Sequence, residues 1–92
     1  MLCRILTENC PENRNAVLEL TSLHFDGFTL LYGRGYWKGT PEETLIIEVS
    51  NDKFDDEEVF FLRVRSLAGQ IKKVNHQEAV LIQRIECGTL LV

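Results

Sequence analysis

The apolar residues in the second half of the chain recur at the spacing of an α-helix. Phe60, Val64, Leu67, Ile71 and Val74 follow one another at intervals of four, three, four and three residues. A helix of 3.6 residues per turn places all five on one side. The pattern therefore predicts a long amphipathic helix, whose apolar face must be covered by a sheet or by another helix.

The ends of this helix are also marked in the sequence. Four acids, Asp55–Glu58, fall in its expected first turn, where they interact favourably with the helix dipole. They could form a cation site, although a solvated helix start explains them more simply. Asn75 and His76 mark the exit, and Gly69 lies off the apolar stripe, where it either permits close packing or only weakens the helix.

Alternating or β-branched segments predict four strands. The clearest is 44–49, with Leu45, Ile47 and Val49 on one face. The segment 2–7 alternates more loosely, with Cys3, Ile5 and Thr7 on one face and Leu2, Arg4 and Leu6 on the other. Two further strands are expected over 28–32 and 77–88, the second centred on residues 79–82.

A second, shorter helix is expected from about Pro11 to His24. Pro11 suits a first helical turn, and Gly27 follows the end, where a helix often needs an unusual backbone conformation. Ala16, Leu20 and Leu23 are spaced as its apolar stripe, which Val17 and Leu18 flank.

The resulting order is β-α-β-β-α-β, which predicts an α+β, ferredoxin-like domain spanning residues 1–92. Right-handed crossovers place both helices on one face of a four-stranded antiparallel sheet, in which the strands lie in the order fourth, first, third, second. The other face carries Leu2 and Leu6, or their alternates, without cover. Because a sheet with apolar residues on both faces usually packs against another layer, we expect a homo-oligomer.

Composition narrows the classes of partner. The net charge of −4 argues against an extended nucleic-acid or anionic-membrane surface. We expect no signal peptide, because Arg4 and Glu8 interrupt the N-terminal segment, and no membrane span, because no apolar run reaches about 20 residues. Three cysteines without a CxxC pair indicate neither a disulfide framework nor a zinc site, so we expect a reduced, cytoplasmic protein.

The connection between the second and third strands, residues 33–43, holds the best candidate site. Arg34 and Lys38 could pair with a small anionic ligand, and Tyr36 or Trp37 could stack on a base. The same residues also suit a hairpin whose aromatic side chains pack across strands or over a neighbouring subunit. Gln77, near the start of the fourth strand, could hydrogen-bond a ligand or the adjacent backbone.

Other groups with chemical potential have simpler structural explanations. His24 and His76 fall at helix ends, where an imidazolium is favoured, and no short spacing to a cysteine supports a metal site. No catalytic residue is assigned, because no nucleophile and base are spaced in a recognisable pattern. No cofactor is indicated.

With its elements placed, the chain resembles the small ferredoxin-like proteins related to the PII signalling family and the divalent-ion-tolerance proteins. The resemblance spans nearly the whole chain at the level of architecture. It implies a trimer, a ligand-sensing connection between the second and third strands, and small-ligand sites in the clefts between subunits. The connection 33–43 is far shorter than that of the PII proteins.

A second resemblance is more local. The residues Asp26-Gly27-Phe28-Thr29, Gly35-Tyr36-Trp37, Leu45–Glu48 and Gln77–Leu81 are similar to a family of short uncharacterised bacterial proteins with the pattern DG-φ-T … G-x-W … Q-x-x-V, where φ is apolar. That resemblance implies no activity.

Together these observations favour a non-enzymatic, PII-like homo-oligomer, preferably a trimer, that binds a small and possibly nucleotide-like anion near residues 33–43. A protein-interaction module and a small ferredoxin-like enzyme remain as alternatives.

Overall fold

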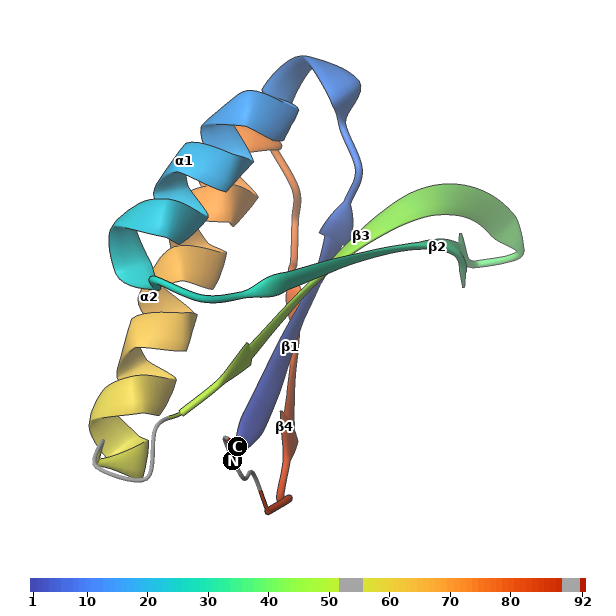
Figure 1. The fold of residues 1–92 in the computed structure, drawn as a ribbon. Coiled ribbons are helices and arrows are strands. Elements are labelled where there is room, and N and C mark those ends of the chain that lie inside the picture. Colours follow the sequence, from blue (N-terminus) through green and yellow to red (C-terminus); the bar gives the residue numbers. More distant parts are fainter. Residues whose placement is uncertain (52–55, 89–91) are drawn as a thin grey trace.

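Two helices lie against one side of a four-stranded antiparallel sheet (Figure 1). This computed structural model describes residues 1–51, 56–88 and 92. The strands are β1 (Leu2–Glu8), β2 (Thr29–Trp37), β3 (Thr40–Ser50) and β4 (Leu81–Ile85), and the helices are α1 (Arg14–His24) and α2 (Glu57–Val74). A short 3₁₀ helix, Pro11–Asn13, precedes α1. The element order and the strand order β2-β3-β1-β4 confirm the predicted ferredoxin-like fold.

The register of the sheet confirms which side of the central strands is buried. Ile5 of β1 lies opposite Ile47 of β3 on one side and Ile82 of β4 on the other. Side chains directly opposite one another share a face of the sheet, so these three form one apolar row beneath the helices. The predicted row Cys3, Ile5 and Thr7 is buried, whereas Leu2, Arg4 and Leu6 point to the other face and are only half-buried.

Helix α2 supplies the other half of the core, as its spacing predicts. Phe60, Val64, Leu67 and Ile71 are buried, and Val74 packs against the same cluster. The carboxylate of Asp56 caps the helix by accepting from the backbone N–H groups of Glu58 at 2.8 Å and Val59 at 3.2 Å. The first-turn acids therefore have a structural role, although Asp55 lies outside the described residues.

The predicted apolar stripe of α1 is only partly right. Val17 and Thr21 are buried and Leu20 packs against the core, whereas Ala16 is exposed and Leu23 is 82% exposed. The helix is rotated because Thr21 can be buried at low cost: its hydroxyl donates to the backbone oxygen of Val17 at 2.8 Å. An apolar pattern search overlooks a threonine that satisfies its own hydroxyl in this way.

The fourth strand begins later than predicted, at Leu81 rather than at Gln77. Helix α2 is followed by His76 in the left-handed backbone region, with φ of 52°, which turns the chain before Gln77. Gln77 and Glu78 therefore belong to a connection and not to the strand. The apolar C-terminal residues of the sequence, 89–92, fall largely outside the described residues.

Gly69 has no packing role within the described residues. A Cβ atom added to it would meet no other atom within 4 Å. A glycine at this interior position costs the helix about 1 kcal/mol relative to alanine. No helix among the described residues is long and apolar enough to cross a membrane.

Replacing Leu67 by alanine should lower the free energy of unfolding by about 2–5 kcal/mol, because Leu67 is fully buried between α2 and the sheet. Urea denaturation at a fixed protein concentration would measure the loss. Leu23→Ala is the matched control on the exposed side of α1 and should change stability by less than about 0.5 kcal/mol. Comparable losses in both variants would contradict the orientation of α1.

Candidate functional site

The hairpin formed by β2 and β3 extends beyond the rest of the sheet (Figure 1). Strand β1 ends at Glu8, opposite Thr44, so that no third strand among the described elements lies beside the distal part of the hairpin. One backbone hydrogen bond, from Asn9 N to Glu43 O at 2.9 Å, joins its base to the body of the domain. We call residues 33–43 the free ribbon.

The free ribbon is almost entirely β-structure. The sequence predicts a connection over residues 33–43, but β2 continues to Trp37 and β3 starts at Thr40. Only Lys38 and Gly39 form the turn, with φ angles of 50° and 80°. Positive φ at both central positions is what a two-residue hairpin turn of this kind requires, and Gly39 adopts it without steric cost.

Large aromatic side chains are exposed on the free ribbon and at its base. Tyr32 is 61% exposed, Tyr36 69% and Trp37 66%. A two-stranded hairpin is at best marginally stable alone in water, and these rings lack the cover that would stabilise it. Exposed aromatic groups on a projecting ribbon are typical of a surface that contacts a ligand or another protein chain.

The two cations predicted to contact a ligand both lie on the free ribbon. The Arg34 guanidinium lies 3.4 Å from the Glu43 carboxylate on the facing strand, and both side chains are more than 60% exposed. An ion pair this exposed is weak and exchanges readily for another partner. The Lys38 ammonium lies 5.9 Å from the centroid of the Trp37 ring, within the range of a cation–π contact.

Alternation divides these residues between the two sides of the ribbon. Tyr32 and Tyr36, opposite Leu45 and Pro41, continue the row that faces the helices, and Arg34 lies between them. Trp37 belongs to the opposite row, which is continuous with the uncovered face of the sheet. A single ligand bound by one chain therefore would not contact Tyr36 and Trp37 from the same side.

Gln77 is not on the free ribbon. It lies after α2, beside the end of β1, where its carbonyl oxygen accepts from the Thr7 hydroxyl, from Glu8 N at 3.3 Å and from Asn75 Nδ2 at 3.3 Å. Asn75 is buried and also donates to the Glu8 backbone oxygen at 3.1 Å. The structure thus places Arg34, Tyr36, Trp37 and Lys38 together and Gln77 in a separate polar network that joins α2 to β1.

The uncovered face of the sheet is apolar and is continuous with one side of the free ribbon. Two apolar residues of β1, Leu2 and Leu6, lie on it, and register adds one or two from each neighbouring strand: Leu31, Ile46, Leu81 and Ile85. We call this surface the open face; none of the described elements covers it (Figure 1). Arg4 and Glu48 lie in its middle, with Nε and Oε2 3.5 Å apart.

The cysteines and histidines do not form a reactive cluster among the described residues. Burial raises the pKa of both the Cys3 and Cys10 thiols, so that each stays protonated at neutral pH and is a weak nucleophile. His24 hydrogen-bonds to the Gln70 side chain at 2.9 Å at the end of α1. No group of three potential metal ligands comes together in the described part of the chain.

We expect Gln77→Ala to lower the free energy of unfolding by about 1–3 kcal/mol, because it removes the acceptor of the buried Thr7 hydroxyl. Denaturant titration would measure the change. Glu78→Ala, at the exposed neighbouring position, is the control and should have little effect. A Gln77→Ala variant as stable as the unmodified protein would contradict the structural role of Gln77.

Comparison with known proteins identifies the fold and not a family. No family model matches the chain, and no curated protein matches it. Among solved structures, the chain is similar to a phage SAM lyase in its apo state, with a TM-score of 0.72 and 16% sequence identity. The match covers 88% of this chain and 75% of that one. At this identity the likeness shows a shared α+β fold, and it carries no residue of the lyase onto this chain.

Proposed function

We propose that the chain is a non-enzymatic homo-oligomer that binds a small ligand where the free ribbon of one copy meets a second copy. One observation carries the proposal: exposed aromatic and cationic side chains stand on a projecting ribbon that is continuous with an apolar, uncovered sheet face. Neither surface is covered by the residues that the structure describes. A second copy would cover the apolar face and supply the missing wall beside the aromatic rings.

The size of the open face supports a role for the ribbon in this contact. Four strands about 4.8 Å apart, each contributing roughly six residues at about 3.3 Å, make a footprint of roughly 400 Å². A stable interface typically buries about 800 Å² per partner. The flat footprint of the open face is thus modest, and contact with a neighbouring ribbon would enlarge the interface.

The pair Arg4 and Glu48 in the open face favours a specific partner over non-specific hydrophobic association. The Nε atom of Arg4 is buried and has no hydrogen-bond acceptor within the described part of the chain, although Glu48 lies at ion-pair distance. Buried donors usually find an acceptor. Because the Arg4 side chain is 38% exposed as a whole, an acceptor from a neighbouring copy would bind the exposed part of the guanidinium and set the register of the contact. A closed ring of three copies is our preferred assembly, because one heterologous contact repeated three times uses every surface.

The ligand that suits the ribbon is small, flat and anionic. Arg34 and Lys38 supply positive charge, and Tyr36 and Trp37 supply faces on which a base can stack. Because these two rings lie on opposite sides of one ribbon, the proposal places Tyr36 and Trp37 at different subunit boundaries or on opposite sides of the same one. Binding at a boundary would couple ligand occupancy to assembly, which is a means of regulation.

A second candidate is an enzyme that acts on S-adenosylmethionine (SAM). It is favoured by one observation, the shared fold of the phage SAM lyase. The sulfonium and adenine of SAM also suit aromatic faces, the first through cation–π attraction. Incubation of the oligomer with SAM, followed by chromatography of the remaining SAM, distinguishes this candidate: turnover above a heat-inactivated control supports an enzyme, and its absence removes the candidate.

We predict that Ile46→Asp weakens self-association by about 100-fold or more, since it places a charge at the centre of the apolar open face. Sedimentation velocity across a range of protein concentrations would show the change as a shift toward monomer. Leu23→Asp, on the exposed side of α1, is the control and should sediment like the unmodified protein. A monomeric unmodified protein at tens of micromolar would contradict the proposed assembly.

We also predict that at least one nucleotide or signalling dinucleotide raises the melting temperature of the oligomer, because a ligand that binds only the folded state stabilises it. The double variant Arg34→Ala/Trp37→Ala removes a cation and a stacking surface. It should lower the affinity for that ligand about 5- to 150-fold, as expected for the loss of one stacked base. Leu62→Ala, an exposed change on α2, is the control. A thermal-shift screen without hits, or hits unaffected by the double change, would contradict ligand binding at the ribbon.

A further inference from the structure

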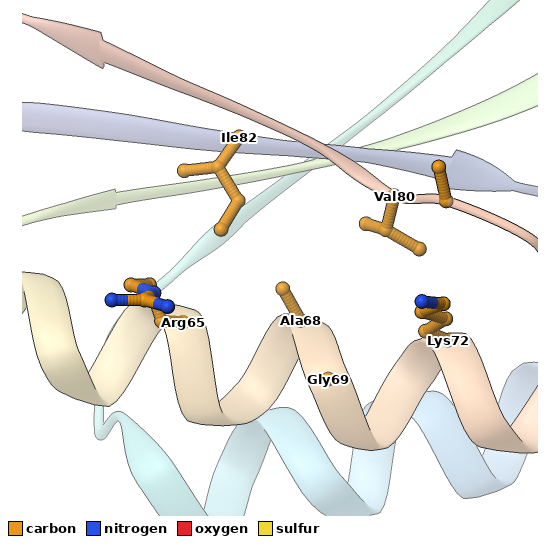
Figure 2. A pocket seen from close by; sticks show the side chains of 7 residues that line it. Arg65, Ala68, Gly69, Lys72, Val80 and Ile82 are labelled. Atoms are coloured by element: carbon orange, nitrogen blue, oxygen red, sulfur yellow. The ribbon is translucent and has the colours of Figure 1, made fainter.

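Besides the free ribbon and the open face, the domain leaves a groove between α2 and β4 unfilled. Figure 2 shows Arg65, Ala68 and Lys72 on α2 beneath Val80 and Ile82, with Gly69 in the helix between them. This hollow has a volume of about 250 Å³. It adjoins a second hollow of about 670 Å³, and the two share Gly69 and Lys72. Together they form one groove along the last three turns of α2.

Gly69 lines both hollows and lies at the middle of the groove. An added Cβ atom would meet no atom of the described chain within 4 Å, so no internal contact requires glycine here. The residue nevertheless weakens the helix relative to alanine. A glycine in an element interior often marks a place where another backbone approaches closely, and the approaching backbone must here come from outside the domain.

The walls of the groove are cationic. Arg65, Lys72 and Lys73 are exposed, and within the described residues no acid lies at ion-pair distance from any of them. The floor is apolar, made by Ala68, Val80 and Ile82. A binding partner that matches this surface carries carboxylates on the side that faces α2 and presents small or apolar groups to the floor.

The other side of the groove is formed by Ala79 and Val80, which precede β4, and by Ile82 of β4, which lies at a sheet edge. Strand β4 is the last strand of the sheet and pairs only with β1 among the described strands. Its outer backbone groups are therefore available to a further strand. From Arg65 to Val74 the helix rises by about 14 Å, which matches about four residues of an extended chain.

We propose that this groove binds an acidic peptide segment in extended form, which adds to the edge of β4 as an extra strand. Its backbone passes over Gly69, and acidic side chains on alternate residues pair with Arg65 and Lys72. The contact uses main-chain hydrogen bonds for affinity and the two cations for selection, as strand addition does generally. The groove does not include the free ribbon or the open face. A test of peptide binding in the groove is therefore independent of the small-ligand function.

The test uses a fluorescein-labelled hexapeptide that alternates glutamate and threonine, and the full chain in its natural assembly state. Fluorescence polarisation should show saturable binding that weakens as salt is raised, and a matched peptide with lysine in place of glutamate should not bind. Arg65→Ala and Lys72→Ala should each weaken binding about 5- to 20-fold. A hexapeptide methylated on alternate backbone nitrogens should lose binding, because it cannot pair with β4.

The decisive variant is Gly69→Ala. It should raise the melting temperature of the protein by about 4–8 °C, since it restores helix propensity without a clash. It should nevertheless lower the affinity for the acidic peptide at least tenfold. Ser66→Ala, an exposed change in the same helix outside the groove, is the control: it also favours the helix and should leave binding unchanged.

Three results would overturn the proposal. The first is equal peptide affinity of Gly69→Ala and the unmodified protein. The second is equal affinity for the methylated hexapeptide, or its displacement by inorganic phosphate at comparable concentration, which would make the groove a site for small anions. The third is a lower oligomer mass for Gly69→Ala in sedimentation, which would show that another copy of the chain already fills the groove.

Discussion

The structure depends on a single layer of apolar contact between one side of the sheet and two helices. The buried residues of β1 and β3 meet α2 there, and the row Ile82, Ile5 and Ile47 crosses three strands at its centre. A chain of 92 residues can build only one such layer. Because side chains alternate along a strand, every residue that enters this core places its neighbours on the opposite side of the sheet. The open face is thus a direct consequence of how the core is made.

The parts of the fold that the sequence predicts are those in which local pattern and tertiary packing agree. The spacing from Phe60 to Val74 identifies α2 and its buried face, because a long helix buries apolar residues at a regular interval. The segment 44–49 identifies the core of β3 for the corresponding reason in a strand. Element order and the handedness of crossovers then give the strand order, which needs no side-chain detail.

The parts that the sequence does not predict are those in which a polar group is satisfied by a distant partner or the chain is stabilised by something outside it. Thr21 is buried because its hydroxyl bonds within α1, and Gln77 leaves the predicted strand to accept from Thr7. The sequence predicts a connection where the free ribbon lies, because glycines and charged residues are typical of loops. Gly35 instead permits close pairing: a Cβ there would lie 2.8 Å from the Thr44 hydroxyl.

The free ribbon and the open face are better understood as one surface than as two. A domain that stood alone would gain little from continuing β2 and β3 past the end of β1, since the added residues expose Tyr36 and Trp37 and bury nothing. The same extension next to a second copy would cover the partner's apolar face and shield its own aromatic rings. The exposure of those rings therefore supports the proposed assembly more directly than it supports a ligand site. Any ligand site that the ribbon contributes to would then form only in the assembled protein, which links what the protein binds to how many copies associate.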